Sequence, residues 1–147
     1  MSRFALVVLA VLPVVVGCSS GSPTTPSPAA GPLAGVWTGT VSRPAGSIDM
    51  RLTLQESRFG AAYVISGRYE ARDAAGTTTG GVGGGLLQSA ATLTLTPDTP
   101  SPCGVAQPFP PGQFLLSLTL DSTGMAGPAV LTLCGGSQPG VARLTKP

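Results

Sequence analysis

Hydrophobic and polar residues alternate along most of the chain from Gly35 onward. The pattern is clearest from Ile48 to Gln55, where every second residue is Ile, Met or Leu and the residues between are polar or charged. Strict alternation places two sets of side chains on opposite faces of a β-strand, whereas a helix repeats every three to four residues. We expect about eight strands, near residues 35–42, 47–55, 62–72, 78–87, 90–96, 113–121, 125–134 and 140–145.

Short links separate most of these strands. Arg43–Gly46, Asp73–Gly76 and Asp121–Gly124 each have a four-residue form that ends in glycine. Asp at the first position of a type I turn accepts hydrogen bonds from the backbone that follows, and Gly supplies a positive φ. Strands joined so tightly pair antiparallel. The sequence therefore predicts an all-β fold, a single up-and-down antiparallel meander that closes into a small barrel and so leaves no exposed edges.

The first 17 residues have the pattern of an export signal. Arg3 precedes an uncharged run from Phe4 to Val16, whose 13 residues are fewer than the roughly 20 that span a bilayer. Val15-Val16-Gly17-Cys18 resembles the lipobox of bacterial lipoproteins, in which the cysteine receives a diacylglyceryl group and becomes the first residue after cleavage. An ordinary signal peptide followed by a chance cysteine is the alternative. We expect residues 1–17 to be removed and Cys18 to anchor the protein to a membrane.

Residues 18–32 are rich in Ser, Pro and Thr and contain almost nothing apolar to bury. Such a composition predicts a disordered tether in front of a domain at residues 33–147. Ser19 directly after the cysteine resembles the residue that directs bacterial lipoproteins to the outer membrane. The expected location is the bacterial cell envelope, with the protein lipid-anchored in the outer membrane and facing the periplasm or the surface.

The residue types that are missing exclude several chemistries. The chain has no His and a single Lys, Lys146, so it lacks a Ser-His-Asp or Cys-His nucleophile system and has no imidazole metal ligand. The glycine run at residues 80–85 does not fit a phosphate-binding motif. We therefore expect no enzyme activity, no metal and no cofactor. Seven basic and six acidic residues follow Gly17, a balance that argues against a nucleic-acid partner.

Two further cysteines, Cys103 and Cys134, lie in the expected domain. Export places them in an oxidising compartment, where an even pair predicts a disulfide. A reactive or metal-binding thiol pair is the alternative, but neither His nor a cluster of carboxylates accompanies them. The bridge would hold the long proline-rich link between Pro97 and Pro111.

Two short motifs resemble known barrels. Gly35-Val36-Trp37 resembles the G-x-W opening strand of lipocalin-type and avidin-type barrels, and Gly67-Arg68-Tyr69 resembles the G-x-Y strand of avidin-like meanders. The lipocalin resemblance implies that Trp37 is buried near one end of the barrel under the guanidinium of Arg143. Avidin-type biotin pockets use several Trp residues, and because Trp37 is the only one here, biotin binding does not carry over.

Two functions remain open at this point. Small inward residues would leave a cavity between Trp37, Tyr63 and Tyr69 that binds a small apolar ligand. Alternatively, side chains fill the interior, since an eight-stranded barrel is only just wide enough to hold them, and the protein is a structural or protein-interaction lipoprotein of the envelope. We expect ligand binding, with the membrane as a partner through the lipid anchor.

Overall fold

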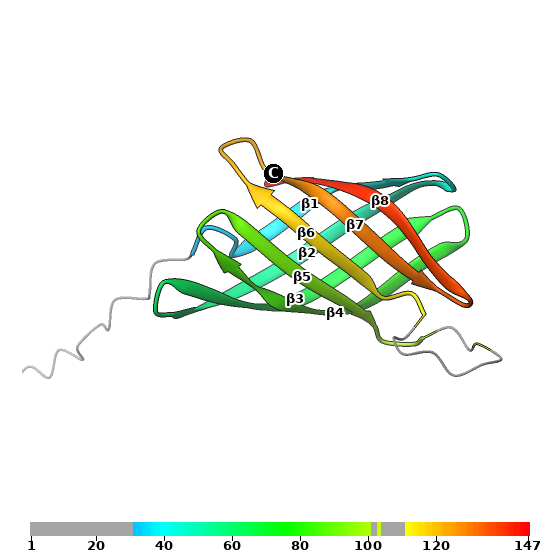
Figure 1. Cartoon of the computed structure of the whole chain (residues 1–147), viewed down its shortest axis with the longest axis horizontal. Coiled ribbons are helices and arrows are strands. Elements are labelled where there is room, and N and C mark those ends of the chain that lie inside the picture. Colours follow the sequence, from blue (N-terminus) through cyan, green and yellow to red (C-terminus); the bar gives the residue numbers. More distant parts are fainter. Residues whose placement is uncertain (1–30, 101–102, 104–110) are drawn as a thin grey trace, which may run out of the picture.

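The computed structural model describes residues 31–100, 103 and 111–147 (Figure 1). These residues form eight strands: β1 (Gly35–Arg43), β2 (Gly46–Phe59), β3 (Ala62–Asp73), β4 (Gly76–Leu87), β5 (Ala90–Pro97), β6 (Phe114–Leu120), β7 (Met125–Leu133) and β8 (Gly136–Thr145). Within these ranges we find no helix with the length and apolarity needed to cross a membrane.

The strands form a closed antiparallel meander. Each strand pairs with the next, and β1 pairs with β8 through Thr38–Ser42 and Val141–Thr145. The all-β, up-and-down barrel predicted from the sequence is thus confirmed. The largest differences in strand bounds are at the end of β2, which extends to Phe59 and not to residue 55, and at β8, which begins at Gly136 and not near residue 140. Pro139 interrupts the alternation and lacks an amide proton, which hides this first part of the strand in the sequence.

The turns form as their residues predict. The Asp121 carboxylate accepts hydrogen bonds from the backbone amides of Thr123 and Gly124, at 2.7 and 3.0 Å. Gly124 takes a φ of +157°, a conformation that side chains rarely adopt. The Thr123 hydroxyl also donates to Asp121, and these bonds lower the pKa of that carboxyl. The Asp121 carboxylate is thus engaged within its own turn, as the sequence predicts.

Alternate residues of every strand point inward and form one apolar core. The buried members come from all eight strands and include Trp37, Leu52, Leu93, Leu116 and Leu144. Apart from Trp37 and Tyr69, no side chain with a polar group is buried among the described residues. The outward residues are mostly Thr, Ser, Gly and charged side chains. The barrel therefore has a mainly polar outer surface around a packed apolar interior.

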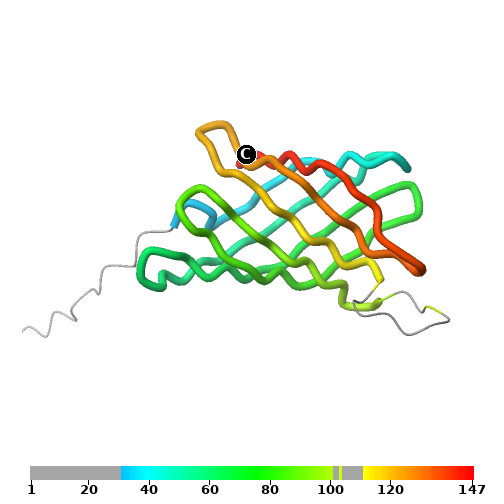
Figure 2. The backbone as a smooth tube through the Cα atoms, viewed as in Figure 1, coloured from blue at the N-terminus to red at the C-terminus, as the bar shows by residue number. Residues whose placement is uncertain are grey.

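The barrel has two different ends (Figures 1 and 2). At one, which we call the plugged end, lie Gly31, the C-terminus and the β2–β3, β4–β5 and β6–β7 turns. At the other, which we call the open end, lie the β1–β2, β3–β4 and β7–β8 turns and the β5–β6 link. The two ends differ in which residues cover them.

Candidate functional site

The segment from Gly31 to Ala34 closes the plugged end. Leu33 is fully buried in the core. Its amide donates to Glu56 Oε1 at 2.6 Å, and its carbonyl accepts the indole Nε1–H of Trp37 at 2.8 Å. Residues 31 and 32, assigned to the tether from sequence, are therefore part of this folded segment. Cys18, the lipobox-like residues before it and the predicted tether up to residue 30 lie outside the described residues.

The cation over Trp37 is Lys146, and the sequence-based choice of Arg143 is wrong. Lys146 Nζ lies 5.1 Å from the centre of the Trp37 ring and donates to the carbonyl oxygen of Pro32 at 2.9 Å. Arg143 is exposed on the outer face because its neighbour Leu144 takes the inward position. Lys146 comes two residues after the inward-facing Leu144, so it continues the same side of β8 beyond the end of the strand. A cation near the C-terminal end of the barrel thus does lie over Trp37, but it is Lys146 and not Arg143.

Trp37, Tyr63 and Tyr69 do not line a common cavity. Trp37 and Tyr69 are each 3% exposed within the core, and Tyr63 packs against that core. The ring of Tyr69 meets Phe114 edge-on, with centroids 6.3 Å apart, and lies over Gly80, where a Cβ atom would overlap it. The small volume of Gly80 therefore makes room for a tyrosine ring and leaves no ligand cavity between these three residues. None of the three lines the cavity described next.

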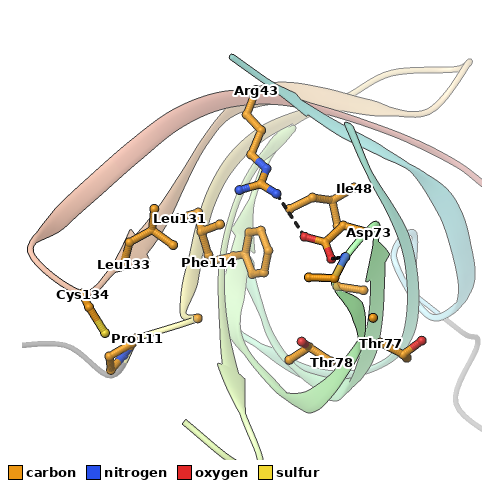
Figure 3. Close-up of a pocket in the computed structure, with 14 residues that line it drawn as sticks. Arg43, Ile48, Asp73, Thr77, Thr78, Pro111, Phe114, Leu131, Leu133 and Cys134 are labelled. Carbon is orange, nitrogen blue, oxygen red and sulfur yellow. Dashed lines mark hydrogen bonds and ion pairs between the residues drawn. The ribbon is translucent and has the colours of Figure 1, made fainter. Parts of the chain in front are cut away.

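A cavity of about 570 Å³ lies at the open end (Figure 3). Its apolar floor and walls come from four strands and include Ile48, Ala71, Phe114 and Leu131. Thr78, Leu133 and the β3–β4 turn continue the lining. Cavities of this size and apolar character are typical of small-molecule sites.

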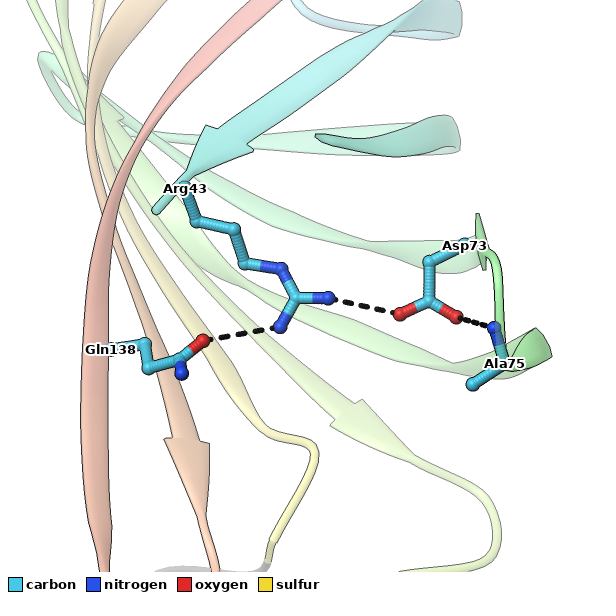
Figure 4. Close-up of polar contacts among 4 residues, drawn as sticks. All are labelled: Arg43, Asp73, Ala75 and Gln138. Carbon is cyan, nitrogen blue, oxygen red and sulfur yellow. Dashed lines mark hydrogen bonds and ion pairs between the residues drawn. The ribbon is translucent and has the colours of Figure 1, made fainter. Parts of the chain in front are cut away.

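Polar groups stand at the rim of this cavity (Figure 4). The Arg43 guanidinium contacts Asp73 Oδ2 through Nη2 at 3.0 Å and donates to Gln138 Oε1 through Nη1 at 3.2 Å. Asp73 Oδ1 accepts the amide of Ala75 at 2.9 Å. The side chains of Arg43 and Asp73 are 14% and 29% exposed, so this ion pair is largely shielded from water. The network joins β1, β3 and β8 across the mouth of the barrel.

Sequence reasoning missed this network because Arg43 and Asp73 begin turns. Both also follow buried residues at a spacing of two: Val41 precedes Arg43, and Ala71 precedes Asp73. Every second residue of a strand points inward, and extending this rule to the last residue of each strand would have identified Arg43 and Asp73 as inward-facing. Gln138 carried no such signal, since the start of β8 was not predicted.

The Cys103–Cys134 disulfide is present, with the two Cα atoms 5.5 Å apart, as is usual for such bridges. Cys134 lines the cavity next to Leu133. The bridge thus attaches the β5–β6 link to the β7–β8 turn at the rim of the cavity. In the described ranges, no group of His, Cys, Asp and Glu side chains is placed to hold a metal ion.

Charged residues gather on the outer face of β2 and β3. Asp49 lies opposite Arg72 and Arg51 opposite Glu70 in the β2–β3 register, as expected for a solvated face. Arg68 forms an exposed ion pair with Asp98, just after β5. Hydrogen bonding to Arg68 lowers the pKa of Asp98. This surface alternates in sign and offers no single-sign patch to a charged partner.

The architecture, an eight-stranded antiparallel meander closed between its first and last strands, is consistent with the lipocalin- and avidin-type barrels that the two motifs resemble. Comparison of this chain with protein-family models, with curated proteins and with solved structures gives no match.

Proposed function

We propose that this protein is a lipid-anchored lipoprotein of the bacterial envelope whose barrel binds a small, mainly apolar molecule in the open-end cavity. The observation that carries the proposal is the cavity itself, about 570 Å³ with an apolar floor and a few polar groups at its rim. The lipobox-like Val15-Val16-Gly17-Cys18 supports the anchor. The role is binding, without catalysis.

The polar groups at the mouth of the open-end cavity indicate which kind of ligand fits. Arg43 and Asp73 compensate each other's charge, so the mouth offers no unbalanced charge to an ion. An apolar body would pack against Phe114 and Ile48, while a hydroxyl or carbonyl group stays near the polar network. A neutral amphipathic molecule fits this lining better than a carboxylate or an amine.

A substitution that fills the cavity tests the proposal. Thr78 lines the cavity and is exposed, so Thr78→Trp should block it without disturbing the core. Thr92→Trp, on the outer face of β5, is the matched control. We expect the neutral fluorophore N-phenyl-1-naphthylamine to bind the unaltered protein saturably, Thr78→Trp to weaken binding by at least about tenfold, and Thr92→Trp to leave it unchanged.

Native mass spectrometry of protein purified from its own envelope tests for a ligand acquired in the cell. The absence of both saturable fluorophore binding and a co-purified molecule would contradict ligand binding.

For the anchor, mass spectrometry of the N-terminal peptide should find Cys18 carrying a diacylglyceryl group. An unmodified Cys18, or cleavage elsewhere, would contradict the lipoprotein assignment.

A partner-facing barrel is the second candidate, and two observations favour it. The middle of the barrel is packed with apolar side chains. Strands β4 to β7 contain no charged residue, and on their outer face the exposed Leu115 lies directly opposite Val130. Cross-linking in the envelope that recovers one protein partner through this face, together with a negative ligand test, would establish this alternative.

A further inference from the structure

Four apolar residues form a row on the outside of the barrel at the plugged end. Phe59 lies opposite Ala62, Ala62 opposite Leu87, and Leu87 opposite Ala90, across β2 to β5. Phe59 is 79% exposed and Leu87 58% exposed. We call Phe59, Ala62, Leu87 and Ala90 the rim patch. Val64, 54% exposed, extends it by one step along β3.

The rim patch makes no contribution to the core. All four positions have outward parity, and the core beneath this end is already covered by Leu33 and Leu86. Phe59 and Leu87 are the two most exposed large hydrophobic side chains of the described residues. Apolar side chains gathered at neighbouring turns, as these are, mark a surface that contacts something other than water.

Basic and acidic side chains are equally frequent at the plugged end, but the charged residue directly beside the rim patch in the chain is basic. Arg58 precedes Phe59, and its guanidinium Nε donates to the carbonyl of Gly60 at the tip of the turn. Lys146 lies at the same end, where its ammonium is over Trp37 and donates to the carbonyl of Pro32. Of the acidic side chains there, Glu56 accepts the amide of Leu33 and Asp121 accepts bonds within its own turn. An apolar row with one adjacent arginine suits the boundary between headgroups and acyl chains of a bilayer.

The course of the chain brings this end close to a membrane. The described chain begins with Gly31 at the plugged end (Figure 2). Only the 12 residues from Ser19 to Ala30 separate it from Cys18. Even fully extended, these residues span about 40 Å. A lipid on Cys18 would therefore keep Gly31, and with it the plugged end that carries the rim patch, near the bilayer, where even weak contacts are favoured by the high local concentration.

We propose that the rim patch docks on the membrane surface, with Phe59 and Leu87 inserted at the boundary of headgroups and acyl chains and with Arg58 near lipid phosphates. The proposal rests on the proposed lipid anchor for the proximity of the bilayer. Its consequence is an orientation in which the barrel stands on its plugged end. The open-end cavity then faces away from the membrane, accessible to molecules in the aqueous compartment.

Site-specific fluorescence tests this orientation. The lipidated protein is reconstituted in vesicles of phosphatidylethanolamine and phosphatidylglycerol, with the polarity-sensitive nitrobenzoxadiazole label on Ala90→Cys. Ser47→Cys, exposed at the opposite end of β2, is the matched control. Cys103 and Cys134 are bridged and do not react. We expect the label at 90 to shift to shorter wavelength and to be quenched by brominated acyl chains, while the label at 47 does neither.

Removal of the two large side chains separates docking from anchoring. In the Phe59→Ser/Leu87→Ser background, the label at 90 should lose its membrane signal while the lipidated protein still floats with the vesicles. The melting temperature should stay unchanged, because both side chains are exposed. Equal signals from positions 90 and 47 on floating vesicles would overturn the docking proposal and leave the anchor intact.

If Cys18 proves to carry no lipid, the anchor fails and docking is tested without it. The unlipidated chain is then mixed with an excess of the same vesicles. Vesicle binding that weakens by about tenfold or more in Phe59→Ser/Leu87→Ser would support the rim patch as a membrane contact, since burial of one such side chain is worth about that factor. No vesicle binding by the unlipidated chain would overturn the proposal.

Discussion

Tyr69 carries a hydroxyl group into the barrel that has no hydrogen-bond partner among the described residues. Burial, and to a smaller extent the negative charge of Asp98, raises the pKa of Tyr69 to about 12. The ring packs well against Phe114, so the shape of the side chain suits the core while its polar atom does not. A buried polar atom without a partner lowers stability by roughly 1–3 kcal/mol.

Tyr69→Phe keeps the ring and removes the unpartnered atom. We expect the free energy of unfolding to rise by about 1 kcal/mol, measured by urea unfolding at neutral pH. Tyr63→Phe is the control, because Tyr63 is only partly buried, and it should change stability little. A loss of stability in Tyr69→Phe would show that the hydroxyl has a partner in the folded protein.

The same residue predicts a response to alkaline pH. The pKa of Tyr69 is raised from 10.0 to about 12 on folding, so the fold favours the protonated phenol. This contribution to stability is fully present below pH 10 and is lost as the pH rises toward 12. Tyr69→Phe should therefore lose less stability than the unaltered protein over this interval. Parallel curves for the two proteins would contradict the shift.

At the scale of the strand, inward glycines allow neighbouring backbones to approach closely. A Cβ atom on Gly39 would overlap the carbonyl oxygen of Arg143 on β8. Gly67 and Gly127 make the same kind of approach to Thr53 and Ser117 of the adjacent strands. Glycine within a strand often marks a tight bend where a barrel closes. In the sequence, the small volumes of Gly39 and Gly67 suggested only a hollow interior.

Gly39→Ala should destabilise the barrel because the obstructing atom is backbone and cannot rotate away. We expect a loss of about 2–3 kcal/mol, the size of an overpacking defect. Gly81→Ala on the outer face of β4 is the matched control, since nothing lies within 4 Å of its added Cβ. It should leave stability unchanged or raise it by about 0.5 kcal/mol. Equal thermal unfolding of the two variants would show that the close approach carries no strain.

At the scale of the whole molecule, two kinds of link join distant parts of the barrel. Backbone pairing joins β1 to β8, and the disulfide joins the β5–β6 link to the β7–β8 turn. The backbone closure makes the sheet continuous, so the sheet should not depend on the bridge. The disulfide acts mainly by restricting the unfolded chain, over a sequence separation of 31 residues.

Cys103→Ser/Cys134→Ser should lower the free energy of unfolding by about 3–4 kcal/mol, as the chain-entropy relation gives for a loop of this length. Far-ultraviolet circular dichroism should retain its β-sheet signal at room temperature. Reduction of the unaltered protein is the control and should produce a loss of the same size. A loss of the β-sheet signal in the variant would mean that the bridge is needed to hold the barrel closed.

The sequence by itself determined the strands, their order and most of their ends. Alternation from Ile48 to Gln55 and glycine turns such as Asp121–Gly124 are local features, governed by side-chain direction and backbone sterics over a few residues. The cysteine pairing also followed from the sequence, because the domain contains only Cys103 and Cys134.

Only the tertiary structure decided which residues meet at each end of the barrel. Lys146 over Trp37, and Arg43 beside Asp73 and Gln138, are contacts between residues 109, 30 and 95 positions apart. Such contacts depend on the register between β1 and β8. They also depend on whether the residues beyond the last buried position of a strand still point toward the barrel axis. A shift of one residue moves every side chain of a strand to the other face, so Lys146 and not Arg143 lies over Trp37. The position of the cavity likewise depends on the tertiary structure. Leu33 covers one end of the barrel and leaves the cavity at the other, and which end it covers is decided by packing between segments distant in the chain.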